Sequence, residues 1–408
     1  MNNSGLKIAV INVDFEDSSA GALARQLYYY GKDKGHVMYA FYGRGEKVKE
    51  DNVFCIDNTL EVIFHKVMTL LTGNQGYYSK HATKLLLEAL NKSKIDVVIL
   101  IQIHGYYINE PMLFEFLKEN KIKTIYITSD EYAGLGKCCY HNDCDKYKFE
   151  CKACNYISDY PQSLFFDKSN RIWKMKRNAY DGMDIVFIGP KTNIEVFKNS
   201  SLLKNRKLVE ADWGINIDKY KFCEYDDLYE KYNIPRNKKY ILTVAPFSQE
   251  RKGVKRYFLE VAKKMSEEFH FINVGFDIDK KSIELPNNFT AIPFIKDQSE
   301  LVKFYSLSDL YVLASVQDTQ PLSLLFALSC GTPVCCFYVS GLKYLNPNDN
   351  EIIKYSKDIT VEGLSNIIMN INKKNSRVSK KCRDYIIEKY SDKLFSERVF
   401  NEIYRMDK

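Results

Sequence analysis

The segment DLYVLASVQDTQPLSLLFALSCGTPVCCFYV, residues 309–339, decides the fold class of this chain. Its apolar run Asp309–Ser315 predicts a buried strand, and Pro321–Ser329 predicts a helix. The turn residues Gly331–Pro333 end that helix, and the apolar residues that follow predict a second strand. A strand, a helix and a second strand in this order form the repeating unit of a parallel sheet covered by helices.

The same alternation occurs in two series along the chain. The first series has short apolar runs at Lys7–Val13, Asp96–Ile103, Lys123–Ser129 and Asp184–Ile188. The second begins at Tyr240 with YILTVAP and continues with FHFINVGF, FTAIPFI, DLYVLAS and TPVCCFYV. We therefore expect an α/β protein with two domains of similar layout and a cleft at the carboxyl ends of their strands.

The connection between the two series is Leu208–Phe222, which contains polar residues but no long periodic stretch, and we place the boundary near Trp213. The last residues predict one or two amphipathic helices with an apolar stripe of Tyr385, Ile386, Tyr390, Phe395, Val399 and Ile403. The expected parts are residues 1–212 with a Cys-rich insertion at 138–154, residues 213–379, and a C-terminal helical segment at 380–408.

The charge of the chain is only weakly basic. Lys and Arg number 59 and Asp and Glu number 52, so the surplus of 7 is spread over 408 residues, and we expect no nucleic-acid partner. The densest basic stretch is KSNRIWKMKR, Lys168–Arg177. It favours a solvated helix face with Ile172 and Trp173 packed inward. Its alternative interpretation is a peripheral contact with membrane phosphates or with an anionic lipid-linked acceptor.

The cysteines indicate a reducing compartment. Eleven is an odd number, no signal peptide precedes Ile8, and the strongest apolar run, Val97–Ile101, is far too short to span a bilayer. In such a compartment we expect six scattered cysteines to be small buried hydrophobic residues: Cys55, Cys223, Cys330, Cys335, Cys336 and Cys382. We expect a protein of the cytoplasm, in solution or at the inner face of the membrane.

Four other cysteines lie within 17 consecutive residues. Cys138, Cys144, Cys151 and Cys154 follow the pattern Cys-x5-Cys-x6-Cys-x2-Cys, with Cys139 as an extra thiol and His141 as a further candidate ligand. Tetrahedral zinc binds four such ligands, and a site closed by four thiolates has no open position for catalysis. The sequence therefore favours a structural zinc ion, with reduced buried thiols and redox chemistry as the alternatives.

The start of the helix at Pro321–Ser329 is a candidate phosphate site. Thr319 or Gln320 is its expected N-cap. A helix that begins just after a strand of a parallel sheet directs free N–H groups toward the strand ends, where a diphosphate can bind. Arg251 and Lys252, which follow the first strand of the second series, can supply cations to the same phosphates.

These stretches resemble a known enzyme family. DTQPLSLLFALSCGTPV from Asp318 is similar to the donor-binding segment of family 4 glycosyltransferases with the GT-B fold, and QERKGVKRYFLEVAKKM is similar to their phosphate-contacting segment. HGYYINEPMLFEFLK, SDEYAGLGKC, DCDKYKFECKAC, YPQSLFFDKSN and SSLL resemble the capsular polysaccharide and colanic acid branch. The resemblance extends from about Ile8 to the C-terminal helix. It implies two Rossmann-like domains with an interdomain cleft and a C-terminal helix that crosses back to the first domain.

The resemblance also implies an activity and its residues. The reaction is a retaining transfer of a sugar from a nucleoside diphosphate sugar to a saccharide acceptor, lipid-linked or free, without an obligatory metal at the phosphates. The catalytic residues that it implies are His104 facing the transferred sugar, Asp130 as the Asp of a His-Asp pair, and Asp318 orienting a donor hydroxyl. The implied donor-binding residues are Gly21, Arg251, Lys252, Phe294, Ile295, Thr319, Gln320, Leu322, Ser323 and Phe326.

Some of these residues also have a purely structural interpretation. His104 can be a satisfied histidine in a loop. Phe294 and Ile295 fall where the family holds the nucleobase through main-chain groups, and we favour core packing for their side chains. Gly21, in SSAGALARQL, is expected in a loop that approaches the transferred group, because the lack of a Cβ permits close contact.

The chain departs from the family pattern at three places. Phe326 stands where the family has a Glu that accepts hydrogen bonds from the ribose, and restoring it with Phe326→Glu is expected to improve donor affinity unless Phe326 is core. Ser129 replaces the His of the His-Asp pair. Trp213–Asn216, WGIN, replaces the usual Asn-Gly-Ile-Asp.

Two alternatives follow from these departures and from the fold class. The first is a catalytically weakened homologue that serves as a binding or assembly subunit, for which Phe326 and Ser129 are the motivating residues. The second is a nicotinamide-dependent enzyme. The second is disfavoured because no Gly-x-Gly-x-x-Gly follows a strand.

Overall fold

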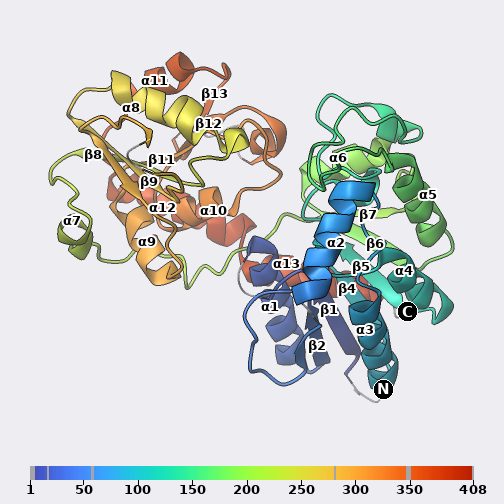
Figure 1. Cartoon of the computed structure of the whole chain (residues 1–408). Coiled ribbons are helices and arrows are strands. Elements are labelled where there is room, and N and C mark those ends of the chain that lie inside the picture. Colours follow the sequence, from blue (N-terminus) through green and yellow to red (C-terminus); the bar gives the residue numbers. More distant parts are fainter. Residues whose placement is uncertain (1–4, 16–17, 57–58, 280–281, 346–350, 407–408) are drawn as a thin grey trace. The chain divides into compact units, whose positions relative to one another are not determined.

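The structure, a computed structural model, describes residues 5–15, 18–56, 59–279, 282–345 and 351–406. The chain forms two units (Figure 1). The first unit comprises Met1–Asp212 and Phe395–Lys408, and the second comprises Trp213–Leu394.

The first unit is built on a seven-stranded sheet in the order β3-β2-β1-β4-β5-β6-β7, in which every pairing is parallel. Its strands are β1 (Lys7–Asn12), β2 (Val37–Tyr42), β3 (Val53–Cys55), β4 (Val97–Leu100), β5 (Lys123–Ile127), β6 (Ile185–Gly189) and β7 (Lys207–Glu210). Its helices are α1 (Ser19–Asp33), α2 (Thr59–Thr72), α3 (Lys80–Ser93), α4 (Glu110–Glu119), α5 (Ser169–Tyr180) and α6 (Lys191–Asn199), with short 3-10 turns at Tyr132–Gly134 and Lys146–Lys148.

The second unit is built on a six-stranded parallel sheet in the order β10-β9-β8-β11-β12-β13. Its strands are β8 (Lys239–Val244), β9 (Phe269–Val274), β10 (Phe289–Ile292), β11 (Leu310–Leu313), β12 (Val334–Phe337) and β13 (Ile353–Ser356). Its helices are α7 (Asp227–Lys231), α8 (Leu259–Lys264), α9 (Gln298–Leu307), α10 (Leu322–Ser329), α11 (Val361–Met369) and α12 (Ser376–Lys389). Short helical turns lie at Glu250–Lys252, Val254–Phe258 and Ser340–Tyr344.

The central strands are mostly apolar and buried, because helices cover both faces of each sheet (Figure 1). In the second unit, alternate strand residues belong to two separate buried clusters: Tyr311 and Leu313 pack on one face, and Leu310 and Val312 on the other. All six residues of β9 are buried. The predicted fold class, two Rossmann-like parallel sheets with helices, is confirmed.

Both sheets have one position where the strand order reverses. In the first unit the chain proceeds from β1 to β2 and β3 on one side and then returns to β4 on the other. In the second unit the corresponding pair is β8 and β11. Loops diverge at the carboxyl ends of such a strand pair and leave a crevice there, which is where open α/β sheets bind ligands.

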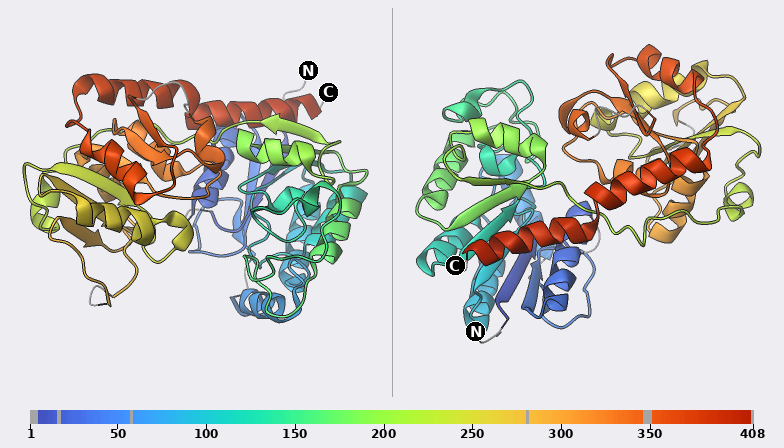
Figure 2. Two further views of the ribbon diagram at one scale, coloured as in Figure 1. Left: turned by 90° about the horizontal axis from the view of Figure 1, so that it is seen from above. Right: turned by 180° about the vertical axis from the view of Figure 1, so that it is seen from behind.

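The C-terminal segment consists of two helices, α12 and α13 (Asp392–Met406), separated at Tyr390 and Ser391 (Figure 2). The predicted apolar stripe is buried along its whole length, from Tyr385 to Ile403. α12 belongs to the second unit, whereas the chain from Phe395 onward belongs to the first. There, Gln26 donates to Ser396, and Lys207 pairs with Glu402 at 2.7 Å.

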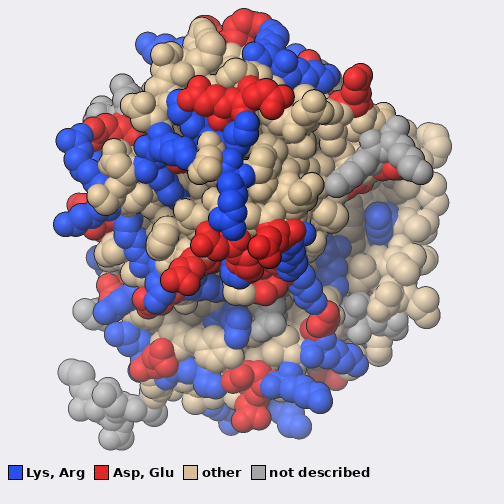
Figure 3. Space-filling view, turned by 90° about the vertical axis from the view of Figure 1, so that its left-hand side faces the viewer, with Lys and Arg blue, Asp and Glu red and all other residues tan. Residues whose placement is uncertain are grey.

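The scattered cysteines and the residues of the basic stretch differ in how deeply the structure buries them. Of the six scattered cysteines, Cys330, Cys335, Cys336 and Cys382 are buried, whereas Cys55 and Cys223 are partly buried. In α5, Ile172 and Trp173 are buried as predicted, and most of the cationic residues are exposed. Lys and Arg side chains are interspersed with Asp and Glu on the face shown in Figure 3. Within the described residues, no helix is long and apolar enough to cross a membrane.

α2 has a polar buried side. Its buried residues are His65 and Thr69. The His65 Nδ1 lies 2.8 Å from Ser79 Oγ, and the Gly76 N–H donates to His65 Nε2 at 3.3 Å. His65 is therefore a neutral imidazole with its proton on Nδ1, and burial lowers its pKa to about 3.

This buried histidine predicts sensitivity to acid. An unfolded chain takes up a proton at His65 near pH 6.5, whereas the folded chain does not, so the free energy of unfolding should fall as the pH falls. The loss between pH 6.5 and 5 should be about 2 kcal/mol. Urea unfolding at both pH values measures it. His65→Gln, which cannot titrate, should lose less stability over this interval, and an equal loss in both proteins would contradict the assignment.

Candidate active site

The carboxyl ends of β8 and β11 bring together two cations and a carboxylate. Lys252 Nζ lies 2.7 Å from Asp318 Oδ2 and Arg251 Nη1 lies 3.6 Å from the same oxygen. Arg251 Nη1 also donates to the Gln317 carbonyl at 2.5 Å. The Lys252 and Asp318 side chains are 19% and 12% exposed, so the pair is accessible at its edge. We call Arg251, Lys252 and Asp318 the basic-acid cluster.

Backbone contacts fix the loop that carries these cations. Gly253 has a φ of +66°, and a Cβ at this position would stand 2.2 Å from the Ala314 carbonyl oxygen just beyond β11. Only glycine permits this approach. The Val316 N–H then donates to the Arg251 carbonyl at 3.1 Å. The loops after β8 and β11 are thereby held side by side.

The helix that follows Asp318 starts differently from the prediction. α10 begins at Leu322 with Pro321 as its N-cap, and no side chain caps it, so the expected cap at Thr319 or Gln320 is wrong. Gln320 is occupied elsewhere, because its amide accepts from the Trp213 N–H at 2.8 Å and donates to the Trp213 carbonyl at 2.9 Å. Pro321 itself offers no side-chain acceptor to the first N–H groups of α10.

The remaining residues at the start of α10 have mixed environments. Thr319 is buried. Leu322 is half-buried and packs against the core of the second unit. Ser323 accepts a hydrogen bond from the Tyr311 hydroxyl at 2.8 Å, which ties the first turn of α10 to β11.

Phe326 is a packing residue in this structure. Its ring stacks on Tyr220, with centroids 3.7 Å apart and planes 10° apart, and it meets Tyr305 edge-on at 6.3 Å. Parallel stacking and edge contacts of this kind stabilise aromatic clusters. The expected gain in donor affinity from Phe326→Glu must therefore be weighed against the loss of this stack.

Phe326→Glu should lower the free energy of unfolding by about 2–4 kcal/mol, because a charged group replaces a stacked ring. The melting temperature should fall accordingly. Phe326→Leu keeps an apolar side chain and should cost less. Thermal unfolding of both variants measures this difference. A Glu variant as stable as the parent would show that the ring is not needed for packing.

Three other predictions are resolved by burial or by the place of the residue in the fold. Ile295 is buried in the core of the second unit, in agreement with core packing. Phe294 is 77% exposed, so core packing is wrong for this residue, because it lies in the loop that follows β10 and is not covered there. Gly21 lies in the first turn of α1, where its N–H donates to the N-cap Ser18, so its expected place in a loop is also wrong.

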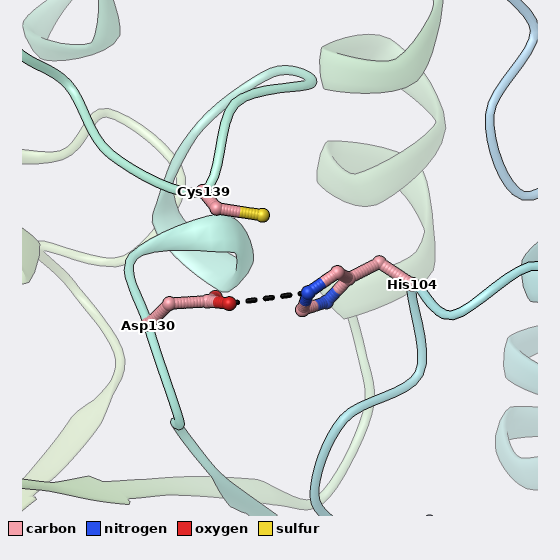
Figure 4. A group of neighbouring side chains, drawn as sticks. All are labelled: His104, Asp130 and Cys139. Atoms are coloured by element: carbon pink, nitrogen blue, oxygen red, sulfur yellow. Dashed lines mark ion pairs between the residues drawn. The ribbon is translucent and has the colours of Figure 1, made fainter. Parts of the chain in front are cut away.

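In the first unit, His104 and Asp130 lie within hydrogen-bond distance of each other (Figure 4). His104 follows β4 and Asp130 follows β5, and His104 Nε2 lies 3.1 Å from Asp130 Oδ2. The Tyr132 N–H donates to the other carboxylate oxygen at 3.0 Å. Ser129 precedes Asp130 in the chain, and the histidine that contacts Asp130 is His104, at the end of another strand, β4.

The hydrogen bond between His104 and Asp130 has a defined direction. Burial opposes ionisation of Asp130, but the His104 imidazole and the Tyr132 N–H hold the pKa of this carboxyl below its ordinary value. A carboxylate accepts from Nε2–H, so in the neutral imidazole Nδ1 is an acceptor. His104 Nδ1 is buried and has no hydrogen-bond partner among the described residues. It can accept a hydroxyl proton or, once protonated, donate to developing negative charge.

Cys139 completes this group and was not predicted as a site residue. Its sulfur and the ligand atoms of His104 and Asp130 lie within 4.8 Å of one another (Figure 4), so the three residues could hold a metal ion. Burial raises the pKa of the Cys139 thiol well above its ordinary value. The sequence offered one signal for Cys139: it directly follows Cys138, a predicted zinc ligand.

Lys176 and Glu110 both contact Tyr132, whose ring lies against His104. Lys176 is buried and its Nζ donates to the carbonyls of Tyr132, Leu135 and Gly136 at 2.5–3.1 Å. The Tyr132 hydroxyl donates to Glu110 Oε1 at 2.7 Å, and the Tyr132 ring packs against His104 at 4.5 Å. Burial lowers the pKa of Lys176 to about 8. A solvated-face interpretation of the basic stretch misses this residue.

The four clustered cysteines line one cavity of about 30 Å³ in the first unit, together with His141 and Tyr147. The sulfurs of Cys138 and Cys154 are 3.9 Å apart. Zinc–sulfur bonds of about 2.3 Å in a tetrahedron place sulfurs about 3.8 Å apart. Among the described residues, the four cysteines do not form a close group of candidate metal ligands as His104, Asp130 and Cys139 do. A structural zinc ion stays a prediction.

Purified protein should contain about one zinc ion per chain, and chelation should lower its melting temperature because the metal braces the loop. Elemental analysis and thermal unfolding measure these quantities. Cys151→Ser should lower the zinc content, whereas Cys223→Ser, in the second unit, should not. Only trace zinc in freshly purified protein would leave buried reduced thiols or redox chemistry as the explanation.

Comparison with known proteins identifies the class of the chain. Residues 238–371 match the family described as "Glycosyl transferases group 1". The chain is 21% identical over 345 residues to the putative colanic acid biosynthesis glycosyl transferase WcaC of Escherichia coli K12, covering 81% of this chain and 82% of that protein.

A second relative matches over a shorter region. It is the N,N'-diacetylbacillosaminyl-diphospho-undecaprenol alpha-1,3-N-acetylgalactosaminyltransferase of Campylobacter jejuni, 28% identical over 151 residues, which cover 35% of this chain and 39% of that protein. Among solved structures, Anabaena HepE in complex with UDP and glucose superposes with a TM-score of 0.69 at 11% identity, over 98% of this chain and 99% of that chain. Residues 238–371 are therefore a glycosyl transferases group 1 domain, and the chain is an enzyme of the glycosyltransferase class with the GT-B fold.

Proposed function

We propose that this chain transfers a sugar, with retention of configuration, from a nucleoside diphosphate sugar to a saccharide acceptor in the biosynthesis of a surface polysaccharide or glycan. The basic-acid cluster at the carboxyl ends of β8 and β11 carries the proposal. Two cations and a carboxylate at the reversal of strand order, beside an uncapped helix start, suit a diphosphate and a neighbouring hydroxyl.

In this proposal the cations stabilise the leaving group. When the bond between the sugar and the diphosphate breaks, negative charge develops on the diphosphate, and Lys252 and Arg251 offset it. A bound diphosphate competes with Asp318 for Lys252, and the released carboxylate can then accept from a sugar hydroxyl. His104, oriented by Asp130, accepts from or donates to the transferred sugar through Nδ1.

The similar proteins support the donor and acceptor classes. The HepE structures contain UDP, UDP with glucose, and UDP-glucose. The Campylobacter relative is named for a diphospho-undecaprenol acceptor, so a lipid-linked saccharide is the acceptor that we propose. We propose no obligatory metal at the phosphates, and activity that survives chelation would agree with this.

A ligand screen followed by product analysis tests the proposed function. Nucleoside diphosphates and their sugars should raise the melting temperature, because a ligand of the folded state stabilises it. The best donor should then be consumed by transfer or slow hydrolysis, and NMR of the product should show the donor's anomeric configuration. Binding without turnover would favour the weakened homologue with an assembly role. Stabilisation by nicotinamide nucleotides alone would contradict the proposal.

A further inference from the structure

The outward side of α2 is a stripe of large apolar side chains. Leu60, Ile63, Phe64, Val67 and Leu71 are 42–76% exposed, whereas the buried residues of this helix are His65 and Thr69. At about 100° per residue, the five apolar residues lie on one side of the helix, opposite the two buried ones. α2 lies on the outside of the first unit (Figure 1). Its polar side faces the protein and its apolar side faces solvent.

A neighbouring loop extends this apolar area. Leu164, Phe165 and Phe166 are 47%, 68% and 54% exposed. The loop is held against α2, because the Leu164 N–H donates to the Leu70 carbonyl at 2.8 Å. Gly73, with a φ of +73°, lets the Phe166 carbonyl approach to 2.3 Å of where its Cβ would stand. We call these eight side chains the α2 surface: Leu60, Ile63, Phe64, Val67, Leu71, Leu164, Phe165 and Phe166.

An exposed apolar area of this kind is unusual for a protein that stays free in water. The charges beside it favour an anionic partner. α2 and the stretch from Leu164 to the end of α5, residues 59–72 and 164–180, contain six Lys and Arg but two Asp and Glu. Lys66 is exposed on α2, Lys168 Nζ lies 5.6 Å from the centre of the Phe166 ring, and Arg171 donates to Asn74 just after α2. Of these six cations, Lys176 is buried.

We propose that the α2 surface docks on an anionic lipid bilayer, with the apolar stripe among the acyl chains and the surrounding cations at the phosphates. Apolar residues on one side of a helix with Lys and Arg beside them bind the bilayer interface in this way. A second copy of this chain is a poorer occupant. A twofold interface would place the same basic groups against one another, which like charges oppose.

The docking surface is joined to the His104 site through one buried residue. Gln75, three residues beyond the end of α2, donates to the His104 carbonyl at 3.1 Å and is fully buried. Tyr160, close to the Leu164–Phe166 loop in sequence, donates to the same carbonyl at 3.2 Å. This step rests on the proposed function: docking would bring the transfer site to an acceptor whose lipid is in the bilayer.

Vesicle binding tests the docking without requiring turnover. The full chain should sediment with vesicles of phosphatidylcholine and phosphatidylglycerol, and much less with vesicles of phosphatidylcholine alone. Ile63→Ser with Phe64→Ser should reduce binding to the anionic vesicles at least about tenfold, because two large side chains no longer enter the lipid. Phe222→Ser removes an exposed aromatic ring of the second unit and is the matched control that should bind normally. Lys66→Ala with Lys168→Ala should weaken binding to the anionic vesicles, and added salt should do the same.

Equal binding by the parent and the Ile63→Ser and Phe64→Ser variant would overturn the proposal, as would an absence of binding by a folded parent protein. A dimer in size-exclusion chromatography that the double variant dissociates, without vesicle binding, would identify a second copy as the occupant instead. Since the readout is sedimentation, a protein that binds vesicles but transfers no sugar would contradict the proposed function alone.

Discussion

Lys252→Ala should lower kcat/KM for the nucleotide sugar by about 10² to 10³, the largest effect that we expect from a single substitution. Lys252 is the cation closest to Asp318, at 2.7 Å, and in the proposal it stabilises the charge that develops on the leaving diphosphate. Loss of one such preorganised group typically has an effect of this size. The variant also leaves Asp318 without this partner, so the carboxylate would repel a diphosphate more strongly. Steady-state kinetics with the donor found in the ligand screen measures the loss.

Matched variants separate this role from a general loss of charge. Lys255→Ala removes an exposed cation three residues away and should leave the kinetics unchanged. Lys252→Arg keeps the charge and should retain part of the activity. Adding Asp318→Asn to Lys252→Ala should restore some donor affinity, because it removes the repulsion. A change of less than about threefold in the folded Lys252→Ala variant would contradict the assigned role.

His104→Ala should lower kcat by about 10² while the affinity for the free nucleoside diphosphate changes little. Asp130, at 3.1 Å, positions the imidazole. The other ring nitrogen, Nδ1, is buried without a hydrogen-bond partner among the described residues, and in the proposal the donor sugar supplies that partner. General acid–base or hydrogen-bond assistance by a positioned histidine typically contributes at this level. Measuring kcat together with calorimetric binding of the nucleoside diphosphate separates the two effects.

His81→Ala, at an exposed position of the same unit, is the control for this measurement. Asp130→Asn keeps an oxygen that accepts from Nε2–H, so it should retain more activity than Asp130→Ala, and a positioning role requires this order. Equal loss of donor binding and turnover in His104→Ala would instead indicate a structural histidine.

The sequence predicts the local elements well where turn residues bound the apolar runs. β11, α10 and β12 follow from Asp309–Phe337 because proline and glycine mark their ends. The sequence patterns did not predict β2, β3, β7 and β13. β3 and β7 are edge strands of three and four residues, whose burial is partial, so they leave little periodic signal.

The contacts between distant residues could not be predicted from patterns. Lys252 and Asp318 are 66 residues apart, and they meet because β8 and β11 are neighbours across the reversal of strand order. The stack of Phe326 on Tyr220 and the pairing of Asp130 with His104 likewise depend on which loops the fold places together. α2 is the opposite case. An apolar stripe ordinarily predicts a buried side, and here the helix buries His65 and Thr69 instead.

Hydrogen–deuterium exchange with and without a saturating nucleoside diphosphate tests most directly whether the diphosphate binds at the ends of β8 and β11. Ligand contact and ordering should slow the exchange of backbone amides in residues 249–253 and 317–323, and this slowing should be lost or much reduced in Lys252→Ala. Protection confined to other segments of the chain, with these two exchanging at the ligand-free rate under saturating ligand, would contradict the account.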